Sequence, residues 1–237
     1  MRGKTHCIEV WGDFACFTRP EMKVERFSYP VITPSAARGI FDAIYWKKSY
    51  GFYWQIEKVE ILSMPKYIAL RRNEVKGTAN VQEIVKWMKG KVDIEPFWAD
   101  DMDDELNGRT QRQTMALKNV HYRISAHMRF RTSDPNITSH DKQFERLAKH
   151  GKCFYQPYFG CKEFPAYFRY CDFDSADSLR CKEYAADLGI MIYDTYDLRK
   201  SNDEYTPQFI SVFHAEINKG EMKVPSFESS EVLKPEV

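Results

Sequence analysis

The strictest alternation of apolar and polar residues lies between positions 119 and 131. The even positions are apolar, namely Val120, Tyr122, Ile124, Ala126, Met128 and Phe130. The odd positions are polar or basic. A strand of this kind packs one face on the core and turns the other face outward. We therefore predict a strand that presents a row of cations.

Three segments show helical spacing instead. The clearest begins at Pro34, with Thr33 as N-cap, and its apolar stripe is Ala37, Ile40, Phe41 and Ile44. Residues 139–149 predict a second helix capped by Ser139, and residues 79–90 a short third one. The predicted inward residues are Phe144, Leu147 and Ala148 in the second helix, and Ile84, Val85 and Met88 in the third.

Further strands are predicted at residues 5–17 with a break near Gly12, at 52–70 with an interruption at Pro65, and at 187–194 and 208–218. Residues 225–237 are predicted to form a polar tail. The element order β-α-β-β-α-β indicates an α+β chain with a ferredoxin-like, RRM-like body and a small C-terminal antiparallel β-sheet. We place the body at residues 1–175 and the second domain, with the tail, at residues 176–237.

Composition favours an ordinary globular protein. The chain has 237 residues, of which 43% are hydrophobic and 15% aromatic, which excludes disordered and collagen-like classes. No uncharged apolar run is long enough to span a membrane, and Glu9 and Asp13 lie where a signal peptide is apolar. We expect a soluble, cytoplasmic protein.

The six cysteines are too few for a disulfide scaffold, and a cytoplasmic protein keeps them reduced. Their spacing contains no C-x2-C pair, and His150 with Cys153 lacks a second pair of zinc ligands. We expect free, mostly buried thiols, no metal and no cofactor.

Charge is distributed unevenly. Residues 172–237 carry 14 acidic and 7 basic residues, whereas the first 171 carry 20 and 28, giving net charges of −7 and +8. Residues 109–131 contain six Lys or Arg and no acid. This pattern favours contact with a polyanion such as a phosphate backbone, although a solvated outer face remains an alternative.

Residues 151–170 combine glycines and prolines with many aromatic residues and the cations Lys152, Lys162 and Arg169. The glycines and prolines exclude a long helix. Two interpretations stay open, a packed irregular core and a surface on which bases stack.

Four blocks of sequence together resemble the Cas five family of CRISPR-associated RNA-binding proteins, subtype I-C or d-type, which belongs to the RAMP superfamily. The blocks are YPVITPSAARGIFDAIYW (29–46), RTQRQTMALKNVHYRISAH (109–127), GKCFYQPYFGCKEFPAYF (151–168) and DLGIMIYDTYD (187–197) followed by GEMKVP (220–225). They occur in one order over nearly the whole chain.

The resemblance implies an endoribonuclease that cuts the CRISPR repeat transcript (pre-crRNA) at the base of its hairpin. The implied cut needs no metal, uses the ribose 2′-hydroxyl as nucleophile, and leaves a 2′,3′-cyclic phosphate and a 5′-hydroxyl. The implied partners are the crRNA, whose 5′ handle stays bound, and the other subunits of the type I-C interference complex, Cascade. Binding of duplex DNA is left open.

The resemblance also implies candidate residues. A family tyrosine matches Tyr45 and a family lysine matches Lys118, which would stabilise the phosphorane. Asn119 stands where relatives have a histidine, so His121 becomes the candidate general acid. For contact with the RNA backbone we expect Arg109, Arg112, Arg123 and Arg129, because arginine suits bidentate phosphate binding.

A different class of function stays open beside the enzyme. The same RNA-binding face would serve a non-catalytic scaffold that holds the 5′ handle of the crRNA inside the complex. Tyr45 and Lys118 favour the enzyme, whereas Asn119 favours the scaffold.

Overall fold

The computed structural model describes residues 1–46, 51–77, 80–94, 98, 100, 108–133, 136–171, 180–200 and 209–235. Its strands are β1 (Arg2–Ala15), β2 (Arg26–Phe27), β3 (Phe52–Ile61), β4 (Tyr67–Val75), β5 (Arg109–Phe130), β6 (Tyr167–Tyr170), β7 (Ala186–Asp194), β8 (Ser211–Asn218), β9 (Glu221–Lys223) and β10 (Val232–Leu233). Its helices are α1 (Pro34–Ile44), α2 (Val81–Met88) and α3 (Ile137–Lys149). The chain forms two compact units, one of residues 1–68 and 115–237 and one of residues 69–114.

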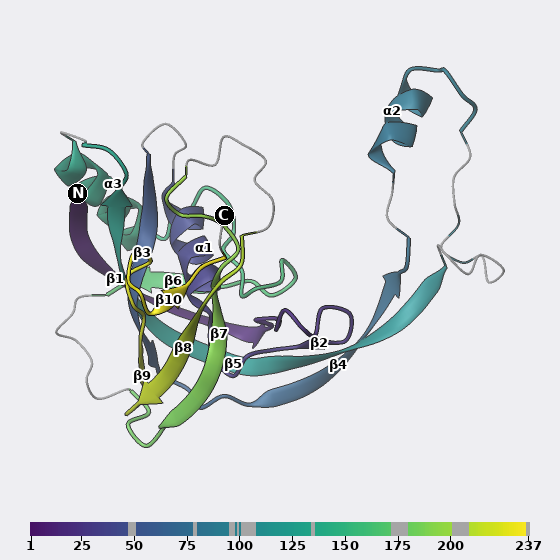
Figure 1. Cartoon of the computed structure of the whole chain (residues 1–237). Helices are drawn as coiled ribbons and strands as arrows, with labels where there is room; N and C mark the ends of the chain where they lie inside the picture. Colours follow the sequence, from purple (N-terminus) through teal and green to yellow (C-terminus); the bar gives the residue numbers. More distant parts are fainter. Residues whose placement is uncertain are drawn as a thin grey trace. The chain divides into compact units, whose positions relative to one another are not determined.

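The larger unit is built on an antiparallel sheet, so the fold is mixed α and β (Figure 1). Along the main path the strands lie in the order β10-β8-β9-β3-β5-β1-β6. The central strands are joined by antiparallel ladders, with β5 between β1 and β3. Within this order, β6-β1-β5-β3 are the strands that alternate along the chain with α1 and α3.

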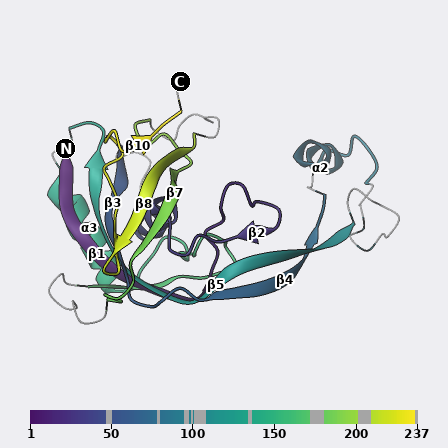
Figure 2. The same cartoon turned by 60° about the horizontal axis from the view of Figure 1, so that its bottom comes forward.

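Two helices cover one face of this sheet. α3 contacts β1 and β6, and it lies beside β1 in both Figure 1 and Figure 2. α1 contacts both β3 and β7. The sheet is therefore curved, because two strands that are far apart in the sequence contact the same helix. The core lies between these helices and the even positions of β5, among them Ile124 and Met128, both fully buried.

α1 forms as its sequence predicts. Thr33 caps it by accepting a hydrogen bond from the backbone N–H of Ala36, and Pro34 is its first residue. The predicted stripe is buried, with Ala37 and Ile40 at 0% exposure. The strands at 52–61 and 67–75, separated around Pro65, are also confirmed.

Two local predictions are wrong. β1 runs without a break through Gly12, whose missing side chain allows close packing, because a Cβ there would lie 2.7 Å from the carbonyl oxygen of Pro165. Ser139 does not cap α3, since the helix begins two residues earlier and its N-cap is Asn136.

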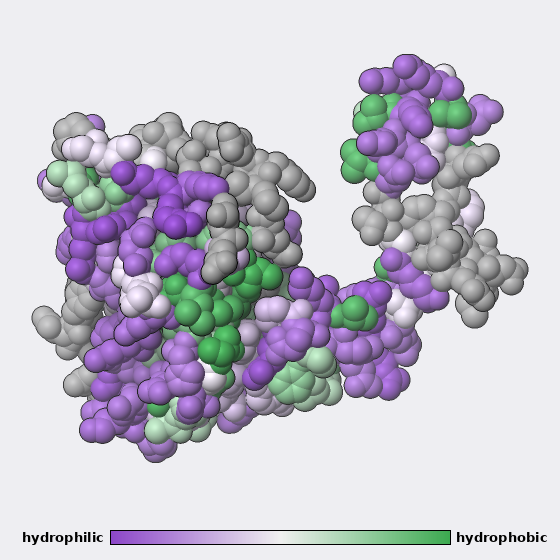
Figure 3. All heavy atoms as spheres, viewed as in Figure 1, coloured by the Kyte–Doolittle hydropathy of each residue, from purple (hydrophilic) through white to green (hydrophobic). Residues whose placement is uncertain are grey.

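The predicted polar tail is partly folded. Phe227 is fully buried and its N–H donates to Oε1 of Gln55, and Val232 belongs to β10. Apolar contacts therefore tie this segment to the sheet despite its polar composition. Figure 3 shows hydrophobic residues gathered over β7 and β8 on one face of this unit, amid a hydrophilic surface.

The smaller unit contains most of β4, all of α2 and the first residues of β5. α2 forms where predicted, but none of its eight described residues is buried, and Met88 is 82% exposed. The prediction that its apolar face points inward is therefore wrong. The acidic segment 100–105 lies almost wholly outside the described residues.

The predicted domain boundary at 175/176 also lies outside the described residues. The strands after it are in the same compact unit as the body, because β9 pairs with β3. Among the helices the structure describes, none combines the length and the apolarity needed to cross a bilayer.

Candidate active site

Tyr45 lies at the C-terminal end of α1, directly after the buried stripe. Its backbone leaves the helical conformation there, with φ −151° and ψ 107°, and its carbonyl accepts a 2.9 Å hydrogen bond from Nε1 of Trp54. Its ring stacks on Phe52, with the centroids 5.9 Å apart. The phenol is therefore held in one place while the residue as a whole remains half-buried.

The Tyr45 hydroxyl is hydrogen bonded to Nδ1 of His140 over 2.8 Å. His140 lies on α3, is 6% exposed, and packs against Phe130 at 5.6 Å between ring centroids. Which atom donates depends on the imidazole tautomer, so the pair can pass a proton in either direction. A phenol and an imidazole in direct contact form a candidate acid-base pair.

His140 was not singled out by the sequence pattern. A signal was present, because His140, Phe144 and Ala148 are spaced by four residues in a segment predicted to be helical. All three are buried in the structure. A histidine on the inward stripe of a predicted helix was therefore the sign that could have identified it.

His121 occupies a different place, on the middle strand β5. Its Nε2 lies 2.7 Å from Oε1 of Glu9, and Glu9 also accepts hydrogen bonds from the guanidinium of Arg169 at 2.8–3.1 Å. Burial opposes ionisation of Glu9, but the bonds from Arg169 and His121 hold its pKa below the ordinary value. These three residues, with Trp11 and others, line a cavity of about 420 Å³.

Lys118 is exposed on the same strand, and its N–H donates to the carbonyl of Lys66 over 2.8 Å. Asn119, which lines the same cavity as His121, has a left-handed backbone with φ 51°. Asparagine tolerates this region better than most residues. The backbone at Asn119 thus departs from regular strand geometry, which interrupts strict alternation between Lys118 and His121.

The structure does not bring Tyr45 together with Lys118 and His121. Tyr45 and His140 pack near Phe130, which is nine residues beyond His121 on β5, or about 30 Å of strand. Phe130 is an even position facing the helices, whereas His121 is an odd one, so the two groups lie on opposite faces of the sheet. The sequence-derived trio is therefore two separate groups.

The predicted row of exposed cations on β5 is wrong for the middle of the strand. Arg123 has a side chain only 4% exposed and lies 3.4 Å from Glu60, and His127 lies 2.7 Å from Glu57. The neighbouring strands β1 and β3 supply the acids that β5 itself lacks. Arg123 therefore stabilises the sheet and is not accessible in the way expected for a phosphate contact.

The other three arginines remain more accessible. Arg129 is exposed near the end of β5. In the smaller unit, the side chain of Arg109 is 58% exposed and paired with Asp100, and that of Arg112 is 30% exposed and 3.2 Å from Glu74.

The six cysteines are free thiols, as expected, but only Cys7 and Cys16 are fully buried. Cys7, on β1, and Cys171, directly after β6, place their sulfur atoms 2.8 Å apart. The remaining four cysteines are half-buried, so the expectation of mostly buried thiols is only partly correct.

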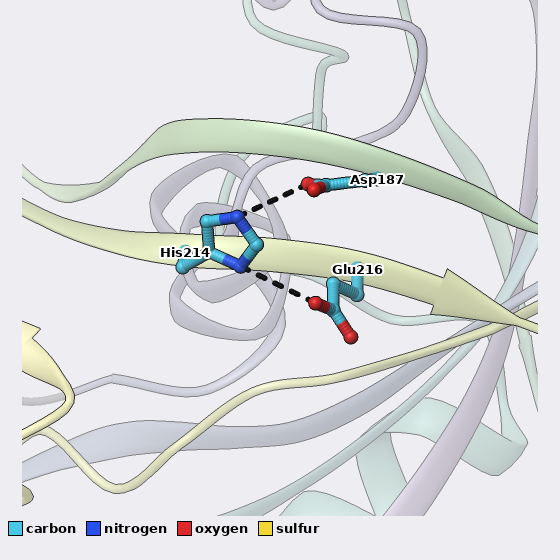
Figure 4. A group of neighbouring side chains, drawn as sticks. All are labelled: Asp187, His214 and Glu216. Atoms are coloured by element: carbon cyan, nitrogen blue, oxygen red, sulfur yellow. Dashed lines mark ion pairs between the residues drawn. The ribbon is translucent and has the colours of Figure 1, made fainter.

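Within the described residues, one group of side chains has the donor atoms and the spacing that could hold a metal ion. It consists of Asp187, His214 and Glu216 on β7 and β8 (Figure 4). Nε2 of His214 lies 3.1 Å from Asp187 and Nδ1 lies 3.5 Å from Glu216. All three are exposed. Because each imidazole nitrogen already faces a carboxylate, the arrangement is that of an ion-paired histidine.

The aromatic segment after α3 serves in part as core. Phe159 is fully buried and Phe164 is 6% exposed, whereas Phe154 is 89% and Tyr155 45% exposed. The packed-core interpretation is confirmed for Phe159 and Phe164, whereas for the exposed Phe154 and Tyr155 the base-stacking interpretation stays a prediction.

Comparison with known proteins identifies the family. The family model Cas_Cas5d, described as CRISPR-associated protein (Cas_Cas5), matches residues 6–225. A protein of Mannheimia succiniciproducens named "CRISPR pre-crRNA endoribonuclease Cas5d" is 41% identical over 233 residues, covering 95% of this chain and 96% of the relative. A protein of Thermus thermophilus with the same name is 35% identical over 246 residues, covering 97% and 95%.

Solved structures agree on the fold. A structure titled "Crystal Structure of CRISPR-associated Protein" superposes with a TM-score of 0.66 at 20% identity, covering 98% of both chains. The protein SMU1763c of Streptococcus mutans, described as functionally uncharacterized, gives 0.64 at 18% identity with the same coverage. With the near-complete sequence matches, these findings show that the chain belongs to the Cas5d family of CRISPR-associated proteins.

Proposed function

We propose that this chain is an endoribonuclease that cleaves CRISPR repeat RNA at the base of its hairpin. Two relatives that share 35–41% of their residues with nearly the whole chain carry the name pre-crRNA endoribonuclease. The observation that carries the proposal to a site is the 2.8 Å contact between the Tyr45 hydroxyl and His140.

The proposed reaction uses the RNA's own 2′-hydroxyl. Its oxygen attacks the adjacent phosphorus and the bond from phosphorus to the 5′-oxygen breaks. The leaving 5′-oxygen takes a proton from solvent water, so that a 2′,3′-cyclic phosphate and a 5′-hydroxyl result. An isolated tyrosine, with a pKa near 10, is a weak base at neutral pH. In the proposed step, Tyr45 takes the 2′-hydroxyl proton as its own proton passes to Nδ1 of His140, and no metal is required.

A second arrangement places cleavage at the cavity on the other face of the sheet. There, His121 would act as general acid for the leaving 5′-oxygen, and Lys118 would stabilise the phosphorane charge. The observation in its favour is that His121 lines a cavity of about 420 Å³. Against it, Glu9 already engages His121 and Arg169.

The chemistry is tested with a labelled repeat RNA in EDTA, beside the same RNA carrying one 2′-deoxy substitution at the cut site. The proposal expects cutting of the first substrate only. Tyr45→Phe and His140→Ala should slow cutting by about 10²- to 10⁴-fold. The matched control is His214→Ala, which changes an exposed histidine. If His121→Ala abolishes cutting and His140→Ala does not, the second arrangement is correct.

We further infer that the body of the larger unit is ferredoxin-like, as in the RAMP superfamily. The order β6-β1-β5-β3, with α1 between β1 and β3 and α3 between β5 and β6, supports this assignment. A ferredoxin-like body of this kind is compatible with a protein that binds RNA and stays bound to the crRNA after cleavage.

After cleavage, we propose that the chain stays on the 5′ handle of the crRNA as a subunit of the type I-C complex, with Arg109, Arg112 and Arg129 contacting phosphates. Each such contact should contribute to the salt dependence of binding. Tight binding of the repeat without cutting would instead favour the non-catalytic scaffold.

A further inference from the structure

A cavity of about 800 Å³ in the larger unit lies outside both groups described above. Its lining comes from the end of β1, from α1, from the segment after α3 and from the end of β7. Four exposed aromatic side chains line it, namely Trp46 (40% exposed), Phe154 (89%), Tyr155 (45%) and Tyr196 (52%). Aromatic rings exposed to this extent do not contribute their full area to the core.

Phe154, one of these four aromatic residues, is fixed through its backbone. The N–H of Phe154 donates to the carbonyl of Ala43 on α1 over 2.7 Å, which fixes the segment after α3 to the end of the helix. Phe154 and Tyr155 themselves meet edge to face, with 6.2 Å between centroids. The aromatic wall is thus attached to the same helix end that carries Tyr45.

Asp42, on α1, lines the cavity together with Arg38. Oδ2 of Asp42 accepts a 2.6 Å hydrogen bond from Arg38, whereas two other guanidinium nitrogens bind the buried Asp194 at 2.7 and 3.1 Å. Oδ1 of Asp42 is buried and has no hydrogen-bond partner. A buried acceptor without a donor is costly, so this oxygen marks a place for an N–H group.

We propose that this cavity holds one unpaired RNA base with an exocyclic amino group, stacked on the aromatic wall and donating that group's N–H to Oδ1 of Asp42. The proposal rests on the RNA substrate of the proposed function. Proteins recognise single-stranded RNA by stacking bases on aromatic side chains, and carboxylates accept from base amino groups.

The chemistry of the acceptor gives a preference among bases. Cytosine and adenine present an amino donor beside a ring-nitrogen acceptor, which complements Asp42 beside Arg38. Uracil flanks its single N–H with two carbonyl oxygens, which a carboxylate repels. The cavity should therefore disfavour uracil.

The position of the cavity suits the proposed reaction. Trp46, which lines it, directly follows Tyr45. A base held there would fix a nucleotide near the phosphate that Tyr45 and His140 act on. The cavity would thus contribute to the choice of the cleaved bond as well as to affinity.

The experiment is a double-mutant cycle that combines one amino-acid substitution with one abasic site in the RNA and measures the binding free energy. Repeat RNAs with a single abasic site at successive unpaired positions are titrated against the full-length chain and against Phe154→Ala. At one position the abasic site should weaken binding to the unaltered chain by roughly 5- to 100-fold, as loss of one stacked base does. Phe154→Ala should weaken binding of intact RNA similarly, and the two changes together should cost no more than either alone.

A second arm measures base preference with oligocytidylate and oligouridylate, independently of cleavage. The unaltered chain should bind oligocytidylate more tightly, and Asp42→Asn should remove that preference. Ile190→Ala, an apolar residue 56% exposed on β7 that does not line the cavity, is the control for both arms.

The outcomes separate the proposals. Additive effects of Phe154→Ala and every abasic site, with no preference between the homopolymers, would overturn the base site. Retained RNA affinity in Phe154→Ala with weaker assembly into the complex would also overturn it, in favour of a protein contact. Coupling without any cutting of the repeat would support the base site and overturn the proposed endoribonuclease.

Discussion

The outer face of the central sheet and the Tyr45 end of its helix-covered face use their histidines differently. On the outer face, His121 and His127 each contact a glutamate on a neighbouring strand, Glu9 and Glu57 respectively. On the helix-covered face, His6 is paired with Asp141 over 3.0 Å, whereas His140 is hydrogen bonded to the Tyr45 hydroxyl over 2.8 Å. Asp42, on the same helix as Tyr45, has a buried oxygen without a hydrogen-bond partner.

This difference separates stabilising charges from groups that are available for chemistry. Glu9 and Glu57 each occupy a ring nitrogen of an outer-face histidine, so a substrate would have to displace a carboxylate to reach that nitrogen. The Tyr45 hydroxyl and the His140 imidazole share a direct hydrogen bond, so a proton taken up at the phenol oxygen can pass on to the imidazole. We therefore assign stability to the Glu9 side and chemistry to the Tyr45 side.

The largest expected effect is on the Tyr45 side. Tyr45→Phe removes one oxygen and keeps the ring that stacks on Phe52. The single-turnover cleavage rate at saturating protein should fall by about 10²- to 10⁴-fold, as expected when a proton-transfer group is lost. Affinity for the repeat RNA should stay unchanged, because the ring remains.

Tyr53→Phe provides the matched control, since it removes a tyrosine hydroxyl on β3 whose residue lies opposite Arg129, an odd position of β5 on the face away from the helices. Its cleavage rate should be close to that of the unaltered chain. Equal rates for Tyr45→Phe and the unaltered chain would show that the chemistry occurs elsewhere.

A smaller effect is expected on stability at Asp42. Burial raises the pKa of Asp42 to about 6, aided by the nearby Asp194 and opposed by Arg38. An unfolded aspartate titrates near 3.9, so ionisation of Asp42 lowers the free energy of unfolding. The full loss applies above pH 6, and there is none well below pH 4. Asp42→Asn should therefore raise the free energy of unfolding by about 3 kcal/mol at pH 8, with little change at pH 3.5.

Urea unfolding at several pH values measures this difference. Asp187→Asn, whose carboxylate is largely exposed, is the control and should show a much weaker pH dependence. A constant offset between Asp42→Asn and the unaltered chain across the pH range would contradict the raised pKa.

Glu9→Gln should have the opposite sign. The pKa of Glu9 is lowered in the folded state, so its ionisation adds stability above the unfolded value of about 4.3 that is lost as pH falls through the folded value. The variant should be less stable by about 1 kcal/mol at pH 7, and the difference should vanish in acid. Greater stability of Glu9→Gln at pH 7 would refute the assignment of this face to stability.

The local signals in the sequence were enough for most of the fold. Thr33 and Pro34 determine where α1 begins, and strict alternation locates β5, because both depend on residues close together in the chain. The partners of β5 are distant in sequence. Glu9 meets His121, and Glu60 meets Arg123, only once the sheet has formed. Because β5 itself contains no acidic residue, its sequence alone predicts an exposed row of cations.

The candidate site shows the same limit. Tyr45 was identified from its motif, but its partner His140 is 95 residues away and meets it only because α1 and α3 pack on one face of the sheet. The sequence points to His121, by contrast, because it is close to Lys118 in the chain. Successive residues of a strand point to opposite faces of the sheet. Closeness to Lys118 in the sequence therefore does not place His121 near Tyr45 at the end of α1.

The smallest expected effect is the one that separates the two faces most directly. His121→Ala removes an imidazole whose side chain is 33% exposed, and Arg169 remains to pair with Glu9. If the outer face serves stability, the cleavage rate should change by less than about threefold, far below the loss expected for a group that transfers a proton. The rate is measured beside that of Tyr45→Phe in the same assay. A large loss in both variants would mean that both faces of the sheet take part in one mechanism. A loss confined to Tyr45→Phe assigns the chemistry to the helix-covered face alone.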